Sequence, residues 1–114
     1  MDIVKTQHES CCVIEVIGDI DTTSSPSLQK ELNNELEQGT QLFIIDMSAT
    51  RYVSSMGLRV FLSHLKKVKA NNGSLVLSGC NQLITDVFRM SGFLNYFKLT
   101  TNKSEALELI TTIK

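Results

Sequence analysis

The sequence lacks a long apolar run, a secretory leader and an excess of charge of either sign. No apolar stretch approaches the ~18 residues that span a bilayer, and no basic segment followed by a long apolar run opens the chain. Lys and Arg together number 11 and Asp and Glu 12, so the net charge is -1. Nucleic-acid modules normally carry a large basic excess. We therefore expect no membrane insertion and no direct nucleic acid binding, although a local basic patch is allowed.

Cysteine and proline are also scarce. The three cysteines, Cys11, Cys12 and Cys80, form neither a CxxC motif nor any other metal-binding spacing, so we expect no metal site. An odd number of cysteines in a short chain without a leader is typical of reduced thiols, which predicts a cytoplasmic location. Pro26 is the only proline, and no linker or low-complexity segment divides the 114 residues. The chain is predicted to be one domain, 1–114.

The apolar residues change their spacing several times along the chain. Short β-branched segments at 3–6 and 12–17 predict an antiparallel pair of strands. The unbroken apolar run at 42–45 predicts a central strand that is covered on both faces. Further strands are predicted at 75–77 and 96–99.

Four segments between and after these strands have helical spacing. Ser25 is the predicted N-cap of the first helix, which ends at Gly39. The second helix begins at Ser55, the third follows Asn81, and the last follows a capping box formed by residues 102 and 105. The resulting order, β-β-α-β-α-β-α-β-α, predicts an α/β domain in which helices pack on a mixed sheet of four to five strands.

Two serines stand where the predicted central strand gives way to the second helix. Unpaired N–H groups and a partial positive charge at a helix N-terminus favour a hydroxyl or a phosphate there. Gly57 has no side chain, so another backbone can approach closely. The residues alone leave three interpretations of Ser54 and Ser55: a helix N-cap, which is the commonest role of such serines, a hydrolase nucleophile, or a regulatory phosphoacceptor.

The hydrolase interpretation is the weakest of the three. A nucleophile elbow reads Gly-x-Ser-x-Gly, whereas Val53 occupies the first glycine position here. A serine nucleophile also needs a base, and His8 and His64 are the only histidines. His8 falls in the predicted hairpin turn, and His64 lies among basic residues on what we interpret as the solvated face of its helix. We therefore predict that the chain is not an enzyme.

Residues 53–58, Val-Ser-Ser-Met-Gly-Leu, resemble the phosphorylation loop of anti-sigma factor antagonists in the bacterial STAS domain family. That loop usually reads Asp-Ser-(Ser/Thr/Ala)-Gly-Leu, and its serine is phosphorylated. Matched residue by residue, Ser54 takes the acidic position, Ser55 the phosphoacceptor position, Met56 the small-residue position and Gly57 the glycine. Because serine replaces the usual aspartate, Ser54 is the second choice as acceptor.

Three other segments extend the resemblance over nearly the whole chain. Residues 18–21, Gly-Asp-Ile-Asp, resemble the family's Gly-Glu-Leu-Asp. Residues 44–48, Ile-Ile-Asp-Met-Ser, resemble its central strand, which ends in Asp-Leu-Ser, and residues 88–93 resemble its Phe-x-(Met/Leu)-(Ser/Thr)-Gly-Leu. The order and spacing of the four segments favour the phosphoacceptor interpretation of Ser55.

The resemblance implies a STAS-type fold and signalling by partner switching. Similar proteins bind an anti-sigma factor that is itself a serine kinase, are released when phosphorylated on serine, and are restored by a serine phosphatase. ATP and Mg²⁺ belong to the kinase, so the chain itself needs no cofactor. Expected partner contacts are Asp21, Ser54, Met56, Gly57 and Arg59.

Some alternatives stay open. Asp21 either organises its own turn with Thr22 and Thr23 or lies near the acceptor serine and supports its role. The polar residues of the second helix form either a solvated face or the basic edge of a partner interface; they are Arg59, Ser63, Lys66, Lys67 and Lys69. The alternative function is a STAS-like accessory subunit that docks on a membrane-transport ATPase without phosphorylation.

Overall fold

A computed structural model describes the backbone of residues 1–113 and the side chains of residues 1–111, so Lys114 of the predicted domain lies outside the described residues. The chain alternates strands and helices in the predicted order. The strands are β1 (Asp2–His8), β2 (Cys11–Ile17), β3 (Leu42–Ala49), β4 (Ser74–Ser78) and β5 (Lys98–Thr100); the helices are α1 (Ser25–Glu37), α2 (Ser55–Ala70), α3 (Gln82–Met90) and α4 (Lys103–Ile113), with a 3₁₀ turn, η1 (Leu94–Tyr96).

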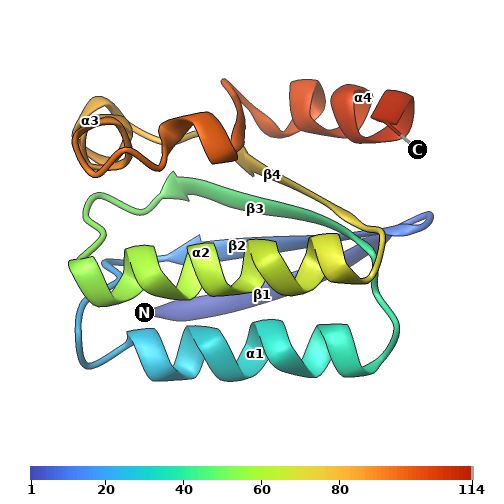
Figure 1. The fold of residues 1–114 in the computed structure, drawn as a ribbon, viewed down its shortest axis with the longest axis horizontal. Helices are drawn as coiled ribbons and strands as arrows, with labels where there is room; N and C mark the ends of the chain where they lie inside the picture. The colour runs from blue at the N-terminus through green and yellow to red at the C-terminus, as the bar shows by residue number, and fades with distance from the viewer. Residues whose placement is uncertain (114) are drawn as a thin grey trace.

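The strands form one mixed sheet in the order β1-β2-β3-β4-β5 (Figure 1). β1 pairs with β2 in antiparallel fashion, and the remaining pairs are parallel. The predicted central position of the 42–45 run is confirmed, because β3 lies between β2 and β4 and its first six residues are buried. The carboxyl ends of β2, β3 and β4 therefore meet at one edge, where ligand and partner sites collect in such sheets.

Helices cover both faces of the sheet. Figure 1 shows α1 and α2 on one face and α4 on the other. The larger apolar cluster lies under α1, α2 and α3, and the smaller one, which includes Ala106 and Ile110, lies under α4. Alternation along β2 divides its two cysteines between these clusters: Cys12 faces the larger and Cys11 the smaller. Two adjacent thiols that point to opposite faces are held apart by the strand itself.

The predicted element boundaries need three corrections. His8 is the last residue of β1 and does not lie in the hairpin turn. The N-cap of α1 is Ser24 and not Ser25, because Ser25 is already helical and buried. The last strand begins at Lys98 and not at residue 96, because η1 occupies the residues before it. The predicted caps at the other helices are confirmed: Asn81 Oδ1 accepts from the Ile84 N–H at 2.8 Å, and Asn102 Oδ1 accepts from the Glu105 N–H at 2.9 Å.

Within the described part of the chain, no helix combines the length and the apolar character that crossing a membrane would demand. All three cysteines are free thiols. Burial raises the pKa of Cys11 to about 11 and that of Cys12 and Cys80 to about 12. A thiol with so high a pKa is almost entirely protonated at neutral pH and is therefore a poor nucleophile.

Candidate functional site

Two loops meet at the carboxyl end of the sheet. One follows β2 and the other joins β3 to α2. The Ile20 N–H donates to the Tyr52 carbonyl at 2.9 Å, and the Ser54 N–H donates to the Ile20 carbonyl at 2.7 Å. Ile20 and Val53 thus form an isolated parallel bridge beyond the ends of the strands. This bridge brings the segment that contains Asp21 beside the segment that contains the serine pair.

Ser54 is the N-cap of α2. Its backbone is extended (φ -78°, ψ 171°), as an N-cap requires, and its Oγ accepts from the Gly57 N–H at 3.2 Å. The side chain is 8% exposed. The capping role of a serine is thereby confirmed for Ser54, and its hydroxyl is both covered and engaged.

Ser55 differs from its neighbour in exposure. It is the first residue of α2 and faces solvent. The first turn of α2 contains no acidic residue, so nothing in that turn opposes an anionic group. A helix N-terminus carries about half a positive charge and free N–H groups. The exposed hydroxyl therefore stands where a phosphate would be electrostatically favoured.

Gly57 is required by close packing within the same turn. A Cβ at this position would lie 2.6 Å from Ile20 Cγ2 and 3.0 Å from Val53 Cγ1. Both contacts are closer than real Cβ atoms tolerate without movement of a neighbour. The close approach expected at Gly57 is present, but side chains make it and not backbone. The first turn of α2 is thus seated on the bridge between the two loops.

Asp21 organises the turn that leads into α1. Its Oδ1 accepts from the Ser24 N–H at 2.8 Å, and its own N–H donates to Ser24 Oγ at 3.0 Å. Hydrogen bonds that the carboxylate accepts from the Ser24 backbone N–H and from the Ser24 side chain lower the pKa of Asp21. The turn-forming interpretation is correct, with Ser24 as the main partner in place of the expected Thr22 and Thr23. The carboxylate remains exposed at the same edge as Ser55.

Exposed side chains surround the serine pair. Met56 is 42% exposed and Tyr52 45% exposed, and Arg59 faces solvent one helical turn after Ser55. Sequence reasoning did not single out Tyr52. Its position directly before the Val-Ser-Ser segment was visible, but its exposure depends on the bridge, which leaves Val53 buried and Tyr52 outside. Aromatic, methionine and arginine side chains are enriched at protein–protein interfaces.

Neither histidine is placed to activate these serines. His8 ends β1 opposite Cys11, at the end of β2 that lies away from the Ile20 bridge. The prediction that His64 is solvated was wrong: it is 2% exposed and packs edge-on against Phe43, with ring centroids 4.5 Å apart. Among the described residues its ring nitrogens find no hydrogen-bond partner. Burial lowers the His64 pKa to about 4.

The burial of His64 follows from the way α2 packs. One side of α2 rests on the sheet, but the adjoining side lies against α1, where Lys67 Nζ donates to Asn33 Oδ1 at 3.1 Å. His64 lies one turn from Lys67 on that side, so it is covered by the neighbouring helix. A search of the described residues for three or more His, Cys, Asp or Glu side chains that could hold a metal ion finds none.

Comparison with known proteins agrees with this architecture. The STAS domain model matches residues 2–106. The anti-sigma-B factor antagonist of Bacillus subtilis (strain 168) is 32% identical over 99 residues, which cover 87% of this chain and 89% of that protein. The aligned region therefore covers most of both chains.

Solved structures share the fold at lower identity. Unphosphorylated SpoIIAA, an anti-sigma factor antagonist, superposes with a TM-score of 0.84 at 17% identity, covering 99% of both chains. Phosphorylated SpoIIAA from Bacillus gives 0.75 at 18% identity, over 96% of this chain and 99% of the other. A sulfate transporter family protein from Wolinella succinogenes gives 0.82 at 16% identity, over 96% and 91%. These likenesses show the fold alone; the family match over residues 2–106 shows that the chain belongs to the STAS domain family.

Proposed function

We propose that this chain is an anti-sigma factor antagonist that works by partner switching. Its unmodified form binds an anti-sigma factor that is also a serine kinase, and phosphorylation of Ser55 releases the complex. A serine phosphatase then restores the binding form. One observation carries the proposal: Ser55 presents an exposed hydroxyl on the first turn of α2, whereas the adjacent Ser54 is buried and engaged as the cap. The 32% identity to a protein named anti-sigma-B factor antagonist supports it.

The switch is electrostatic. A phosphate adds about -1.5 to -2 charges at neutral pH. Without a partner, such a charge in a packed interface costs several kcal/mol, and a loss of about 2.8 kcal/mol already weakens binding roughly a hundredfold. Within its own fold the phosphate is stabilised by the N-terminus of α2 and by Arg59 one turn further on. Phosphorylation thus separates the two proteins and leaves the domain folded.

The proposed contact surface is the edge where the two loops meet. Asp21, Ser54, Met56, Gly57 and Arg59 are its members, as the family resemblance implies, and Tyr52 joins them by exposure. ATP and Mg²⁺ bind to the kinase. This chain acts in the cytoplasm as substrate and binding partner, and it needs no cofactor and performs no catalysis.

Phosphorylation by the cognate kinase tests the acceptor. Incubation with kinase and ATP should add one phosphate, and peptide mass spectrometry should locate it on Ser55. Ser54→Ala is the matched control, because it removes the neighbouring hydroxyl and leaves the acceptor; it should still be phosphorylated, whereas Ser55→Ala should not. Phosphate confined to Ser54, Ser63 or any threonine would refute the assignment.

Titration calorimetry against the same partner tests the switch. Ser55→Ala should keep the affinity of the wild type and resist release by ATP. Ser55→Asp adds about one charge where phosphate adds up to two, so it should weaken binding in the same direction but less completely. Circular dichroism should show both variants folded. Equal affinity of the wild type, Ser55→Asp and the phosphorylated protein would mean that charge at Ser55 is not the switch.

That outcome would favour the accessory-subunit alternative, in which the same loop docks on a membrane-transport ATPase and is not modified. The fold does not separate the two functions, since the Wolinella succinogenes neighbour has it too. Copurification does: a kinase-like anti-sigma factor supports partner switching, and a transporter ATPase supports the alternative.

A further inference from the structure

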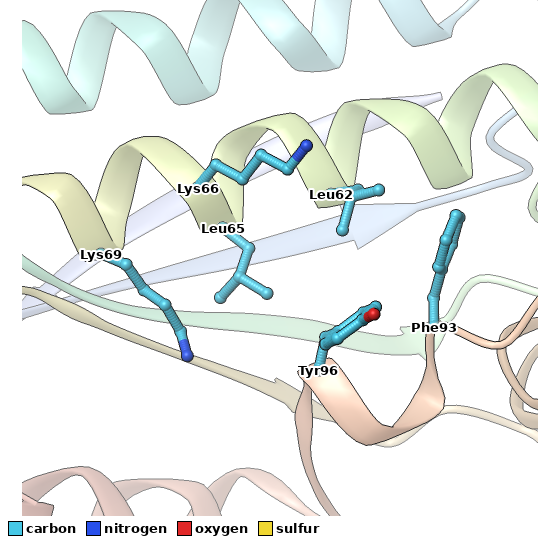
Figure 2. A pocket seen from close by; sticks show the side chains of 6 residues that line it. All are labelled: Leu62, Leu65, Lys66, Lys69, Phe93 and Tyr96. Atoms are coloured by element: carbon cyan, nitrogen blue, oxygen red, sulfur yellow. The ribbon is translucent and has the colours of Figure 1, made fainter.

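A groove lies between the second half of α2 and the turn that follows α3. Its volume is about 330 Å³. Figure 2 shows leucine and lysine side chains from α2 at the groove, and two aromatic rings across from them, Phe93 just before the η1 turn and Tyr96 at its end. The lining residues are Leu62, Leu65, Lys66, Lys69, Phe93 and Tyr96.

The groove continues along the helix toward the end of α2. A second hollow of about 340 Å³ shares Leu65, Lys69 and Tyr96 with the first and extends past Gly73 to Lys98 on β5. Within the described residues β5 pairs only with β4, so the hollow opens beside an edge of the sheet. Two adjoining hollows along one helix form an elongated site, which suits a peptide segment better than a compact ligand.

The apolar side of the groove is already formed in the free protein. The Phe93 N–H donates to the Phe88 carbonyl at 3.0 Å, and the Tyr96 N–H donates to the Phe93 carbonyl at 3.0 Å. These bonds fix the turn and hold the Phe93 and Tyr96 rings with centroids 6.2 Å apart. Tyr96 is nevertheless 59% exposed. A preformed apolar surface loses little conformational freedom when a partner covers it.

The charge of the groove has one sign. Lys66, Lys69 and Lys98 line it, no acidic residue does, and among the described residues no carboxylate forms a salt bridge with any of the three. The wider sequence agrees: residues 47–85 contain five basic residues, Arg51, Arg59, Lys66, Lys67 and Lys69, and no Asp or Glu, although the whole chain has a net charge of -1. The complementary partner is therefore acidic.

We propose that this groove binds an acidic, amphipathic segment of a second protein. The apolar side chains of that segment would cover Leu62, Leu65 and the aromatic pair, and its carboxylates would face the lysines at the rim. The apolar lining distinguishes this occupant from a nucleic-acid strand, whose recognition needs a more extensive basic surface than three lysines provide.

The groove is separate from the serine site. Leu62 and Lys69 follow Ser55 by seven and fourteen residues on the same helix, which places them about 10 and 20 Å away along its axis. Both distances exceed the Debye length of about 8 Å at physiological ionic strength. Binding in the groove should therefore continue when Ser55 carries a charge, so the protein can hold this partner through both phases of a switching cycle.

Fluorescence anisotropy with a synthetic peptide tests the proposal without any kinase. The probe is a labelled peptide of about twelve residues, with glutamate on one helical face and leucine and phenylalanine on the other. It should bind, and replacing either every glutamate by glutamine or every apolar residue by alanine should abolish binding. Lys66→Gln/Lys69→Gln should weaken binding about tenfold, since each exposed ion pair contributes up to about a factor of five, and Tyr96→Ala should weaken it independently.

Lys67→Gln is the matched control, because it removes the same charge from the same helix on the side that faces α1. It and Ser55→Asp should leave peptide binding unchanged, and amide chemical shifts should move around Leu62, Leu65 and Tyr96. The proposal fails if the probe does not bind, if the glutamine peptide or a uridine-rich RNA binds equally well, or if Lys67→Gln weakens binding as much as the double variant. Weakening by Ser55→Asp would overturn the independence of the two sites. None of these results affects the phosphorylation test of Ser55.

Discussion

The two ends of α2 are held in different ways. At the first turn, a side chain caps the helix and another side chain, that of Ile20, sets the limit on the size of residue 57. Just beyond the last turn, at Gly73, backbone sets the tightest limit. A Cβ on Gly73 would lie 2.1 Å from the Gln41 carbonyl oxygen, and the Gly73 N–H donates to the Val68 carbonyl at 2.8 Å.

This difference determines how each end of α2 responds to a change in its packing. Side chains can rotate, so the packing at residue 57 can adjust to a larger residue, although backbone hydrogen bonds of the Ile20–Val53 bridge also fix the position of the first turn. Gln41 and Gly73 immediately precede β3 and β4, and the Ser74 N–H donates to the Gln41 carbonyl at 2.9 Å, so a shift of either backbone would disturb the start of a strand. The serine site is therefore at the end of α2 where side chains limit the packing, and the proposed groove lies toward the end where backbone limits it.

The largest change in stability is expected at acidic pH, through His64, which lies between the two ends of α2. Burial lowers the His64 pKa to about 4, below the ordinary value of 6.5. Between these two pH values His64 is protonated in the unfolded chain but stays neutral in the folded chain. The free energy of unfolding therefore falls by roughly 3 kcal/mol as the pH drops from about 6.5 to about 4. His64→Leu should remove this loss in chemical denaturation at a series of pH values. The same slope in the variant would show that other groups cause it.

Glycine substitutions compare the ends directly. Gly73→Ala should lower the free energy of unfolding by about 3 kcal/mol, because a carbonyl oxygen blocks the new methyl group. Gly57→Ala should lower it by only about 1–2 kcal/mol, because the Ile20 and Val53 side chains can shift. Urea denaturation measures both. Ile20→Ala combined with Gly57→Ala should cost less than the two single changes added together; strict additivity, or a larger loss in Gly57→Ala than in Gly73→Ala, would break the comparison.

The serine pair sharpens the comparison within the first turn. Ser54→Ala removes the cap on α2 and should lower stability by about 1 kcal/mol. Ser55→Ala removes an exposed hydroxyl and should change stability by less than about 0.5 kcal/mol. Thermal melting of the two variants under one condition is sufficient. Equal losses would mean that Ser55 also has a structural role in the fold.

The smallest effect is expected from a reducing agent. The thiols of Cys11 and Cys12 are buried on opposite faces of β2, and all three cysteines are free. Thermal melting with and without reductant should agree within a few degrees, because no cross-link constrains the unfolded chain. A large drop on reduction would show that a disulfide, and not the packing at the helix ends, dominates the stability.

Local patterns predicted the order of elements and three helix starts. The Asn81 and Asn102 caps, and a serine cap at Ser54 or Ser55, were readable because a cap involves residues only three positions apart. The apolar run of β3 identified a central strand for a similarly local reason. The choice between Ser54 and Ser55 as acceptor came from the family resemblance, and the exposure of the two side chains is consistent with that choice.

Contacts between segments that are distant in the chain could not be predicted from the sequence. His64 looked solvated because its neighbours in the sequence are charged, but Phe43 of β3 and the neighbouring helix α1 together bury it. The Ile20–Val53 bridge involves one residue pair outside the strands and has no sequence period. The groove pairs α2 with aromatic residues more than twenty positions away, so helical spacing alone did not indicate it.

The bridge has a consequence for redesign. Because Ile20 accepts from Ser54 and donates to Tyr52, and also fills the space left by Gly57, the segments 18–21 and 50–57 form one transplantable unit. Exchanging only the serine loop with that of a relative would place a foreign first turn on an unmatched Ile20. A chimera that carries both segments should keep its donor's choice of partner, and a chimera that carries one should be poorly folded at this edge.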